Sequence, residues 1–323
     1  MRRAMWCSVT PRKNALAQNH KNQSMSPHVH VASGSGWFPI SLLLALLLTE
    51  FLYLRGWLRL RSASVKLIPA WRVISFSLGL FLIWMAVGSP LAALDEQMLT
   101  VHMIQHLLLM TFAAPLMLLG LPVTPFLQGL PHQLEQSIDA PLFHWPLLQR
   151  FGRVIGRPAF SWLVATATLV GWHVPAIFTL ALRSGAWHLF EQATFLAAGL
   201  LFWWPVVQPW PKVPTEPRWS ILLYLFLATL PCDILSAFLV FSERVAYPVY
   251  LSASRQSGLS VLADQQCAGA LMWTCITIVY LVPAAIISSK LLAPRTPHEH
   301  GLAQSQFSGS PVPQSAPRSL EVV

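Results

Sequence analysis

Residues 99–121 read LTVHMIQHLLLMTFAAPLMLLGL, a mostly apolar run that is long enough to cross a bilayer and yet carries two histidines. His102 and His106 are four residues apart, so on a helix they share one face, with Cβ atoms about 6 Å apart. An imidazole is costly in hydrocarbon, and within a membrane span it normally faces a partner, a cavity or a metal ion. The stretch therefore predicts a membrane helix that carries a functional site.

The rest of the chain has the composition of a membrane protein. Of its 323 residues, 54% are hydrophobic and 10% are charged, against about 25% charged in a typical soluble domain. We expect an all-α, polytopic bundle, because a backbone in lipid must satisfy its own hydrogen bonds and no segment alternates like a barrel strand. Seven stretches are long enough to span the bilayer, namely 37–55, 71–90, 99–121, 159–178, 188–207, 219–241 and 265–289.

Two tails flank the transmembrane domain, which we place at 37–290. The N-terminal tail, 1–36, is expected to be flexible, and translation from either Met1 or Met25 is compatible with the sequence. The C-terminal tail, 291–323, is rich in Pro, Ser, Gln and Gly with almost no apolar periodicity. Such a composition predicts a disordered segment.

Basic residues set the expected orientation, because they gather in loops on the cytoplasmic side. Alternate loops and the C-terminal tail carry Arg55, Arg59, Arg61, Lys66, Arg72, Arg150, Arg153, Arg157, Lys212, Arg218, Lys290, Arg295 and Arg318. The intervening loops carry Arg183, Arg244 and Arg255. We therefore expect the N-terminus outside and the C-terminus in the cytoplasm, although basic residues in the first 24 positions oppose this. Topology also accounts for the formal charge of +9 without a nucleic-acid partner.

In this orientation the histidines of the spans lie in the outer half of the membrane. His102 and His106 lie about one and two turns below the outer surface, at 1.5 Å per residue. His173 lies near the outer end of the fourth span, and His188 opens the fifth with Glu191 at i+3. Groups placed by chance would be divided between both leaflets, so this convergence predicts a site.

Further polar side chains lie on the same side. Asp264 opens the seventh span, while Met98 and Met110 extend the histidine row by one turn in each direction. Thioether and imidazole together suit copper. The methionines as packing, and the acids as partners of an imidazole or as helix caps, remain alternatives. The candidate metal ligands are Met98, His102, His106, Met110, His173, His188, Glu191 and Asp264.

Four motifs carry a family resemblance. They are Met98–Met110 with Ala114-Pro115 and Gly120-Leu121-Pro122, Trp172-His173-Val174-Pro175, His188-Leu189-Phe190-Glu191, and Asp264-Gln265-Gln266. As an ordered set over roughly 37–290 they resemble the CtaG-like integral membrane family of cytochrome c oxidase assembly proteins. The resemblance implies a seven-helix protein of the bacterial plasma membrane that helps to assemble haem–copper oxidase, without being an enzyme. Copper handling at the outer face and contact with oxidase subunits or copper chaperones are also implied.

One position departs from this resemblance. A histidine is expected after the glutamate of the fifth span, where this chain has Gln192. An amide is a poor ligand for a soft metal, so any ligand role at this position is in doubt here. Two other functions remain open on the residues alone: a haem-binding membrane cytochrome, and a small-solute or metal transporter with helices broken in the membrane.

Overall fold

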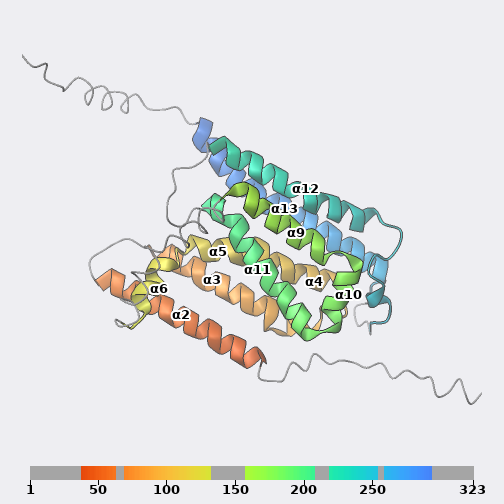
Figure 1. Cartoon of the computed structure of the whole chain (residues 1–323), viewed down its shortest axis with the longest axis horizontal. Helices are drawn as coiled ribbons and strands as arrows, with labels where there is room; N and C mark the ends of the chain where they lie inside the picture. The colour runs from red at the N-terminus through yellow and green to blue at the C-terminus, as the bar shows by residue number, and fades with distance from the viewer. Residues whose placement is uncertain (1–37, 63–68, 132–156, 208–217, 254–257, 293–323) are drawn as a thin grey trace, which may run out of the picture.

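A computed structural model describes residues 38–62, 69–131, 157–207, 218–253 and 258–292. Within these ranges every regular element is a helix, and the long helices run side by side as one bundle (Figure 1). The predicted all-α class is confirmed. The tail 1–36, and all but the start of the tail 291–323, lie outside the described residues.

Six helical runs are long and apolar enough to cross a membrane unaided. They are α2 (Phe38–Ser62), α3 (Ala70–Val87) with the short η1 (Pro90–Ala93), the run 99–119, α11 (Gly185–Val207), α12 (Arg218–Phe241) and α13 (Val261–Leu292). Each coincides with a stretch predicted from hydropathy. The start of α2 and the end of α13 lie at opposite ends of the bundle, as an odd number of crossings requires (Figure 1).

The fourth predicted span is a broken helix. Its two parts, α9 (Pro158–Trp172) and α10 (Pro175–Arg183), meet at 75°, and the number of candidate spans is seven if the pair is counted as one. Pro175 has no N–H to continue the hydrogen-bond ladder of α9. Val174 is accordingly extended, with φ −64° and ψ 123°. The bend lays α10 across one end of the bundle, which we call the α10 end (Figure 1).

The run 99–119 lies in the middle of the bundle and consists of α4 (Leu99–His106), η2 (Leu107–Ala113) and α5 (Ala114–Leu119) (Figure 1). In its most apolar stretch 61% of the residues are buried, against 6% in α2. A span buried to this extent is surrounded by other helices rather than by lipid. Its polar side chains therefore face protein, which is the setting in which intramembrane histidines are tolerated.

The segment η2 is π-helical, with one extra residue in the turn. The N–H of Ala114 donates to the carbonyl of Leu109, five residues earlier. The next carbonyl, that of Met110, would need the N–H of Pro115, which proline lacks. The indole Nε1 of Trp203 donates to it instead, at 3.1 Å. The sequence thus contains both the cause of the irregular turn and its compensation.

Gly199 allows α11 to approach this central run closely. A Cβ atom at Gly199 would lie 2.8 Å from the Cα of Met110, so any side chain there would push the two helices apart. Glu191 lies about two turns before Gly199 on α11. The close approach therefore brings its carboxylate to the histidines of α4. Two short helices complete the described fold, α6 (Val123–Gly129) against α2 and η3 (Pro248–Leu251) in the segment between α12 and α13.

Candidate metal centre

Three buried side chains meet near the α10 end, and we call them the deep triad: His102, His106 and Glu191. The Nε2 atoms of the two histidines lie 2.8 Å apart. Glu191 Oε1 lies 3.5 Å from His102 Nε2 and 3.4 Å from His106 Nε2. The predicted common face of the two histidines is therefore present, and a carboxylate from a second helix closes it into a triangle of ligand atoms.

The deep triad is poorly satisfied by the protein itself. Both carboxylate oxygens of Glu191 and the Nδ1 atoms of His102 and His106 are buried without a hydrogen-bond partner among the described residues. Buried polar atoms in folded proteins are nearly always paired. The unpaired carboxylate of Glu191 beside two imidazole Nε2 atoms therefore marks a position for a ligand. Two imidazoles and a carboxylate form a donor set that a divalent or monovalent transition metal accepts.

Aromatic rings enclose the deep triad. Phe195 stacks on His106 with ring centroids 3.8 Å apart, and Phe178 packs edge-on against His102 at 4.9 Å. These rings exclude water and hold the imidazoles in place. A carboxylate charge in such surroundings is costly unless a cation balances it.

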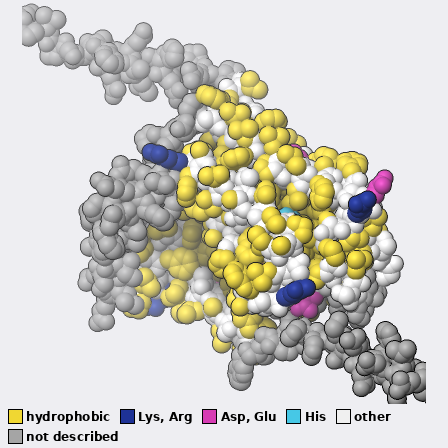
Figure 2. Space-filling model, turned by 45° about the vertical axis from the view of Figure 1, so that its right-hand side comes forward, with side chains coloured by type: hydrophobic (Ala, Val, Ile, Leu, Met, Phe, Trp, Pro, Cys, Tyr) yellow, Lys and Arg dark blue, Asp and Glu magenta, His cyan; other side chains and the backbone are white. Residues whose placement is uncertain are grey.

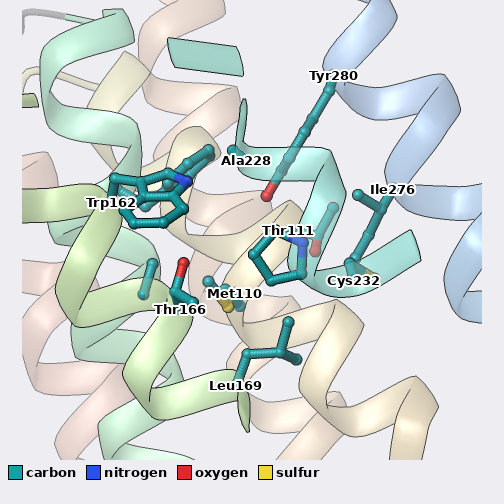
Figure 3. Close-up of a pocket in the computed structure, with 12 residues that line it drawn as sticks. Met110, Thr111, Trp162, Thr166, Leu169, Ala228, Cys232, Ile276 and Tyr280 are labelled. Carbon is teal, nitrogen blue, oxygen red and sulfur yellow. The ribbon is translucent and has the colours of Figure 1, made fainter. Parts of the chain in front are cut away.

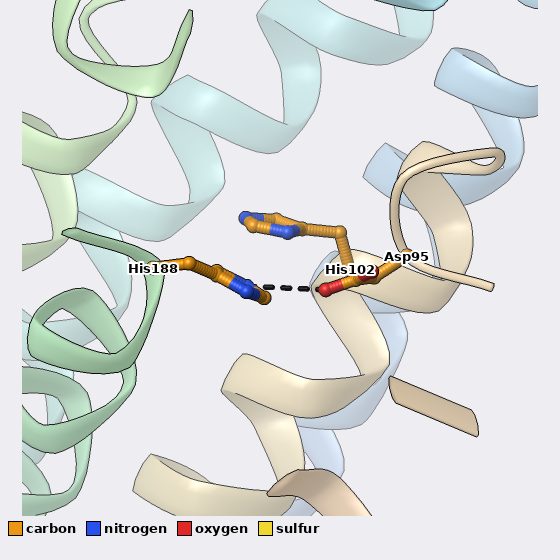
Figure 4. Close-up of side chains that lie close together, drawn as sticks. All are labelled: Asp95, His102 and His188. Atoms are coloured by element: carbon orange, nitrogen blue, oxygen red, sulfur yellow. Dashed lines mark ion pairs between the residues drawn. The ribbon is translucent and has the colours of Figure 1, made fainter. Parts of the chain in front are cut away.

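A second group adjoins the deep triad and shares one of its histidines. Asp95 precedes α4, and its Oδ2 lies 3.1 Å from Nε2 of His188 in the first turn of α11. The His188 ring stacks on the His102 ring at 5.4 Å between centroids (Figure 4). Ligand atoms of Asp95, His102 and His188 lie within 4.8 Å of one another, and we call these residues the rim triad. Burial raises the pKa of Asp95 to about 6 by removing its carboxylate from water.

His173 lies at the corner between α9 and α10, beside the deep triad. Its ring centroid is 6.1 Å from that of His106, and its Nε2 lies 3.3 Å from the Sδ of Met103. Its Nδ1 lies 2.7 Å from the carbonyl of Leu169, and its own carbonyl accepts a hydrogen bond from the hydroxyl of Tyr247. The structure thus supplies a thioether next to the cluster, from a methionine that the sequence analysis did not include.

Gln192 lies between the two triads. Its Nε2 is 3.2 Å from Oε1 of Gln105 and 3.2 Å from Nε2 of His188. The amide therefore links α11 to α4 and fixes the ring of His188. A positioning role explains how glutamine can occupy the position where the family resemblance implied histidine.

Asp264 serves a different purpose. Its carboxylate accepts hydrogen bonds from the backbone N–H groups of Leu99 and Thr100, at 2.8 and 3.2 Å, and from the hydroxyl of Thr100 at 2.7 Å. It therefore caps the N-terminus of α4 from α13, where a negative charge is favoured. The geometry of Asp264 therefore agrees with the helix-cap alternative, since both of its carboxylate oxygens accept hydrogen bonds from α4.

The two methionines of the predicted row lie in different settings from the two histidines. Met98 is the residue before α4, and its carbonyl accepts the N–H of His102. Met110 lies in η2, where the extra residue of the π-turn shifts the i+4 row, and it lines a cavity with Thr111, Trp162 and Cys232 (Figure 3). Met110 packs against Trp172 and Phe195, in agreement with the packing alternative, and a ligand role for Met98 stays a prediction.

Two residues of the cluster were absent from the candidate ligands, Asp95 and Met103. In the sequence, Asp95 lies on the same side as the other polar groups, in the loop before the third span, and Met103 lies off the His102–His106 row. An acid one turn ahead of a histidine-bearing helix is a signal that could have indicated Asp95. Met103 is indicated only by the approach of His173 from another helix.

Comparison with known proteins agrees with the architecture. A protein-family model described as cytochrome c oxidase caa3 assembly factor (Caa3_CtaG) matches residues 51–293. Uncharacterized proteins of Mycobacterium bovis and Mycobacterium tuberculosis are each 28% identical over 229 residues, which is 68% of this chain and 34% of theirs. One of Mycobacterium leprae is 22% identical over 255 residues, which is 78% and 38%. No solved structure matches the chain.

The chain spans little more than a third of the length of the curated relatives that it matches. The family match, in contrast, extends from α2 to the end of α13 and includes both triads. It covers most of this chain and agrees with the resemblance drawn from the histidine motifs. The chain therefore belongs to the Caa3_CtaG family, the cytochrome c oxidase caa3 assembly factors.

Proposed function

We propose that this protein takes part in oxidase assembly by holding a copper ion as cargo at the deep triad. The observation that carries the proposal is the convergence of His102, His106 and Glu191, from α4 and α11, with buried polar atoms that have no hydrogen-bond partner in the described chain. A bound cation supplies the missing partner and balances the carboxylate charge. The role is one of holding and handing over, not of catalysis.

Copper fits this group of residues better than other common metals. Among divalent first-row ions it has the highest affinity for imidazole sites. The thioether of Met103, 3.3 Å from Nε2 of His173, adds a soft donor beside the triad, which suits the cuprous state. The family is described as assembling a cytochrome c oxidase, which is a haem–copper enzyme. Oxidase subunits or copper chaperones are therefore the proposed partners.

The packing of the cluster favours a small ion over a haem. Phe195 covers one face of His106 at 3.8 Å, and the Nε2 of His102 lies 2.8 Å from that of His106. A macrocycle between these side chains would have to displace both neighbours. The second candidate of the sequence analysis, a membrane cytochrome, therefore has no support from this geometry.

The proposed place of action is the outer face of a bacterial plasma membrane. The distribution of basic residues supports an outward α10 end, with the C-terminus in the cytoplasm. A cysteine introduced into the segment 89–98, in a variant without the native cysteines, should then be labelled from the periplasm by an impermeant thiol reagent. Labelling only after the membrane is opened would move the triads to the cytoplasmic side and contradict this placement.

The function is tested in a strain that lacks the gene and carries single variants. We expect His102→Ala and His106→Ala to abolish oxidase maturation, because each removes a ligand atom while alanine is well accepted in a helix. Oxidase activity and the copper content of the purified oxidase are the measurements.

Ser236→Ala is the matched control, since it truncates a fully buried polar side chain in α12, away from the triads. All variants are compared at equal abundance in the membrane. Normal oxidase assembly with both histidine variants at normal abundance would contradict the proposed function.

A further inference from the structure

We propose that the rim triad is a second metal position, through which copper reaches and leaves the deep triad. This inference rests on the proposed function, because it assumes cargo at the deep triad. Asp95 and His188 provide a carboxylate and an imidazole of their own, and His102 belongs to both groups. Two three-residue donor sets with one member in common are adjacent positions for one ion.

His188 of the rim triad is the most exposed member of the two triads, while Asp95 and His106 are 2% and 7% exposed. The side chains of His102 and Glu191 are 0% exposed, while that of His188 is 20% exposed. Histidine atoms are also visible as a small cyan spot between hydrophobic side chains on the surface (Figure 2). An ion from outside therefore meets His188 before it meets Glu191.

The donor sets are matched in charge. Each triad contains one carboxylate and two imidazoles, so a cation that moves from one to the other exchanges one carboxylate for another and keeps His102. It is never left without a balancing charge in a low-dielectric interior, where an uncompensated charge is very costly. The shared histidine thus lowers the barrier to transfer.

The supports of the rim triad are rigid. The hydroxyl of Tyr250 in η3 donates to the carbonyl of Asp95 at 3.0 Å, and Gln192 contacts the ring of His188. These contacts fix a loop residue and a helix-end residue in the geometry of a site. A plain ion pair between Asp95 and His188 is the competing explanation, and it predicts an effect on stability alone.

The experiment measures rates and equilibrium separately, on the full chain in detergent. Copper(I) is supplied from a bicinchoninate buffer, and loading and removal are followed by the colour of the chelator. For Asp95→Asn and for His188→Gln we expect both rates to fall by about tenfold or more, a change of the size that mutations around metal sites produce in affinity or activity. The dissociation constant should change much less, because a gateway slows both directions.

Glu243→Gln is the control for Asp95→Asn, since it removes the same charge at an exposed position just beyond α12. Its rates should equal those of the wild type. Unchanged rates in Asp95→Asn and His188→Gln, with tight binding intact, would overturn the gateway and leave the proposed function standing.

Two further outcomes also decide the matter. A loss of affinity in Asp95→Asn as large as in Glu191→Gln would show one site of five residues, and would overturn the two-position inference. Wild-type protein that binds no copper(I) would overturn the proposed function and the gateway with it. Thermal unfolding of each variant separates loss of fold from loss of transfer.

Discussion

Two carboxylates near the α10 end are equally buried and yet differ in what surrounds them. Glu191 and Asp264 both have 0% exposure. Asp264 accepts two backbone N–H groups and one hydroxyl at the start of α4. Glu191 has no hydrogen-bond donor among the described residues and faces two imidazoles instead. Residue type and burial alone would not separate these two acids.

Under the proposed function, the difference separates a structural carboxylate from a metal ligand. A helix N-terminus supplies donors and a favourable dipole, so the charge of Asp264 is stabilised by the fold itself. For the charge of Glu191, the proposed function supplies the compensation from a bound cation, because neutral imidazoles supply little. The predictions below test this contrast, from the largest expected effect to the smallest.

Copper should stabilise the wild type through the deep triad. At a free ion concentration 100 times the dissociation constant, binding adds about 2.7 kcal/mol to the free energy of unfolding. His106→Ala should lose this gain, whereas Asp264→Asn should retain it. Thermal unfolding in detergent, with and without copper, measures the effect. If copper raised the unfolding midpoint of His106→Ala as much as that of the wild type, the deep triad would not be the copper site and the contrast between Glu191 and Asp264 would have no support.

Truncation of Asp264 should destabilise the metal-free protein. Asp264→Ala leaves the N-terminus of α4 without its cap and should cost about 1–3 kcal/mol. Asp264→Asn keeps one acceptor oxygen and should cost less. The midpoint of thermal unfolding without metal is the measurement, and an unchanged midpoint in Asp264→Ala would show that the cap contributes nothing.

Neutralisation of Glu191 should not lower the stability of the metal-free protein, in contrast to truncation of Asp264. Glu191→Gln keeps the shape of the side chain and removes a buried charge that has no compensating partner. The unfolding midpoint without metal should therefore stay equal or rise. A clear fall would indicate that the carboxylate is already compensated by protonated imidazoles, and that the site needs no cation.

The methionines outside the cluster should matter least. Met98→Leu with Met110→Leu conserves volume, so each change should cost under about 1.5 kcal/mol. We expect the copper(I) affinity of the double variant to stay within about threefold of the wild type, or less than 0.7 kcal/mol. Met103→Leu is the comparison, since its sulfur lies beside His173. If the double variant bound copper(I) more weakly than Met103→Leu, Met98 and Met110 would be the methionine ligands instead of Met103.

Much of the fold could be predicted because hydropathy and helix length determine it. All seven predicted spans have helical counterparts, and Pro175 marked the break in the fourth. The shared face of His102 and His106 followed from helix periodicity. These features are local, so the sequence determines them without knowledge of the packing.

The parts that could not be predicted depend on contacts between distant segments. Met110 left the row because a π-turn, stabilised by Trp203 from another helix, changed the register. Asp264 caps the N-terminus of α4, which lies 165 residues earlier in the chain. Met103 entered the cluster through His173, from the corner of α9 and α10. Periodicity within one helix carries no information on these encounters.

One pair of variants tests the central claim most directly. Glu191→Gln and Asp264→Asn make the same change, carboxylate to amide, at two fully buried positions. Copper titration of the purified full chain should give tight binding in the wild type and in Asp264→Asn. In Glu191→Gln the affinity should be weaker by about 100-fold or more. Copper binding in Glu191→Gln as tight as in the wild type would contradict a metal site at the deep triad.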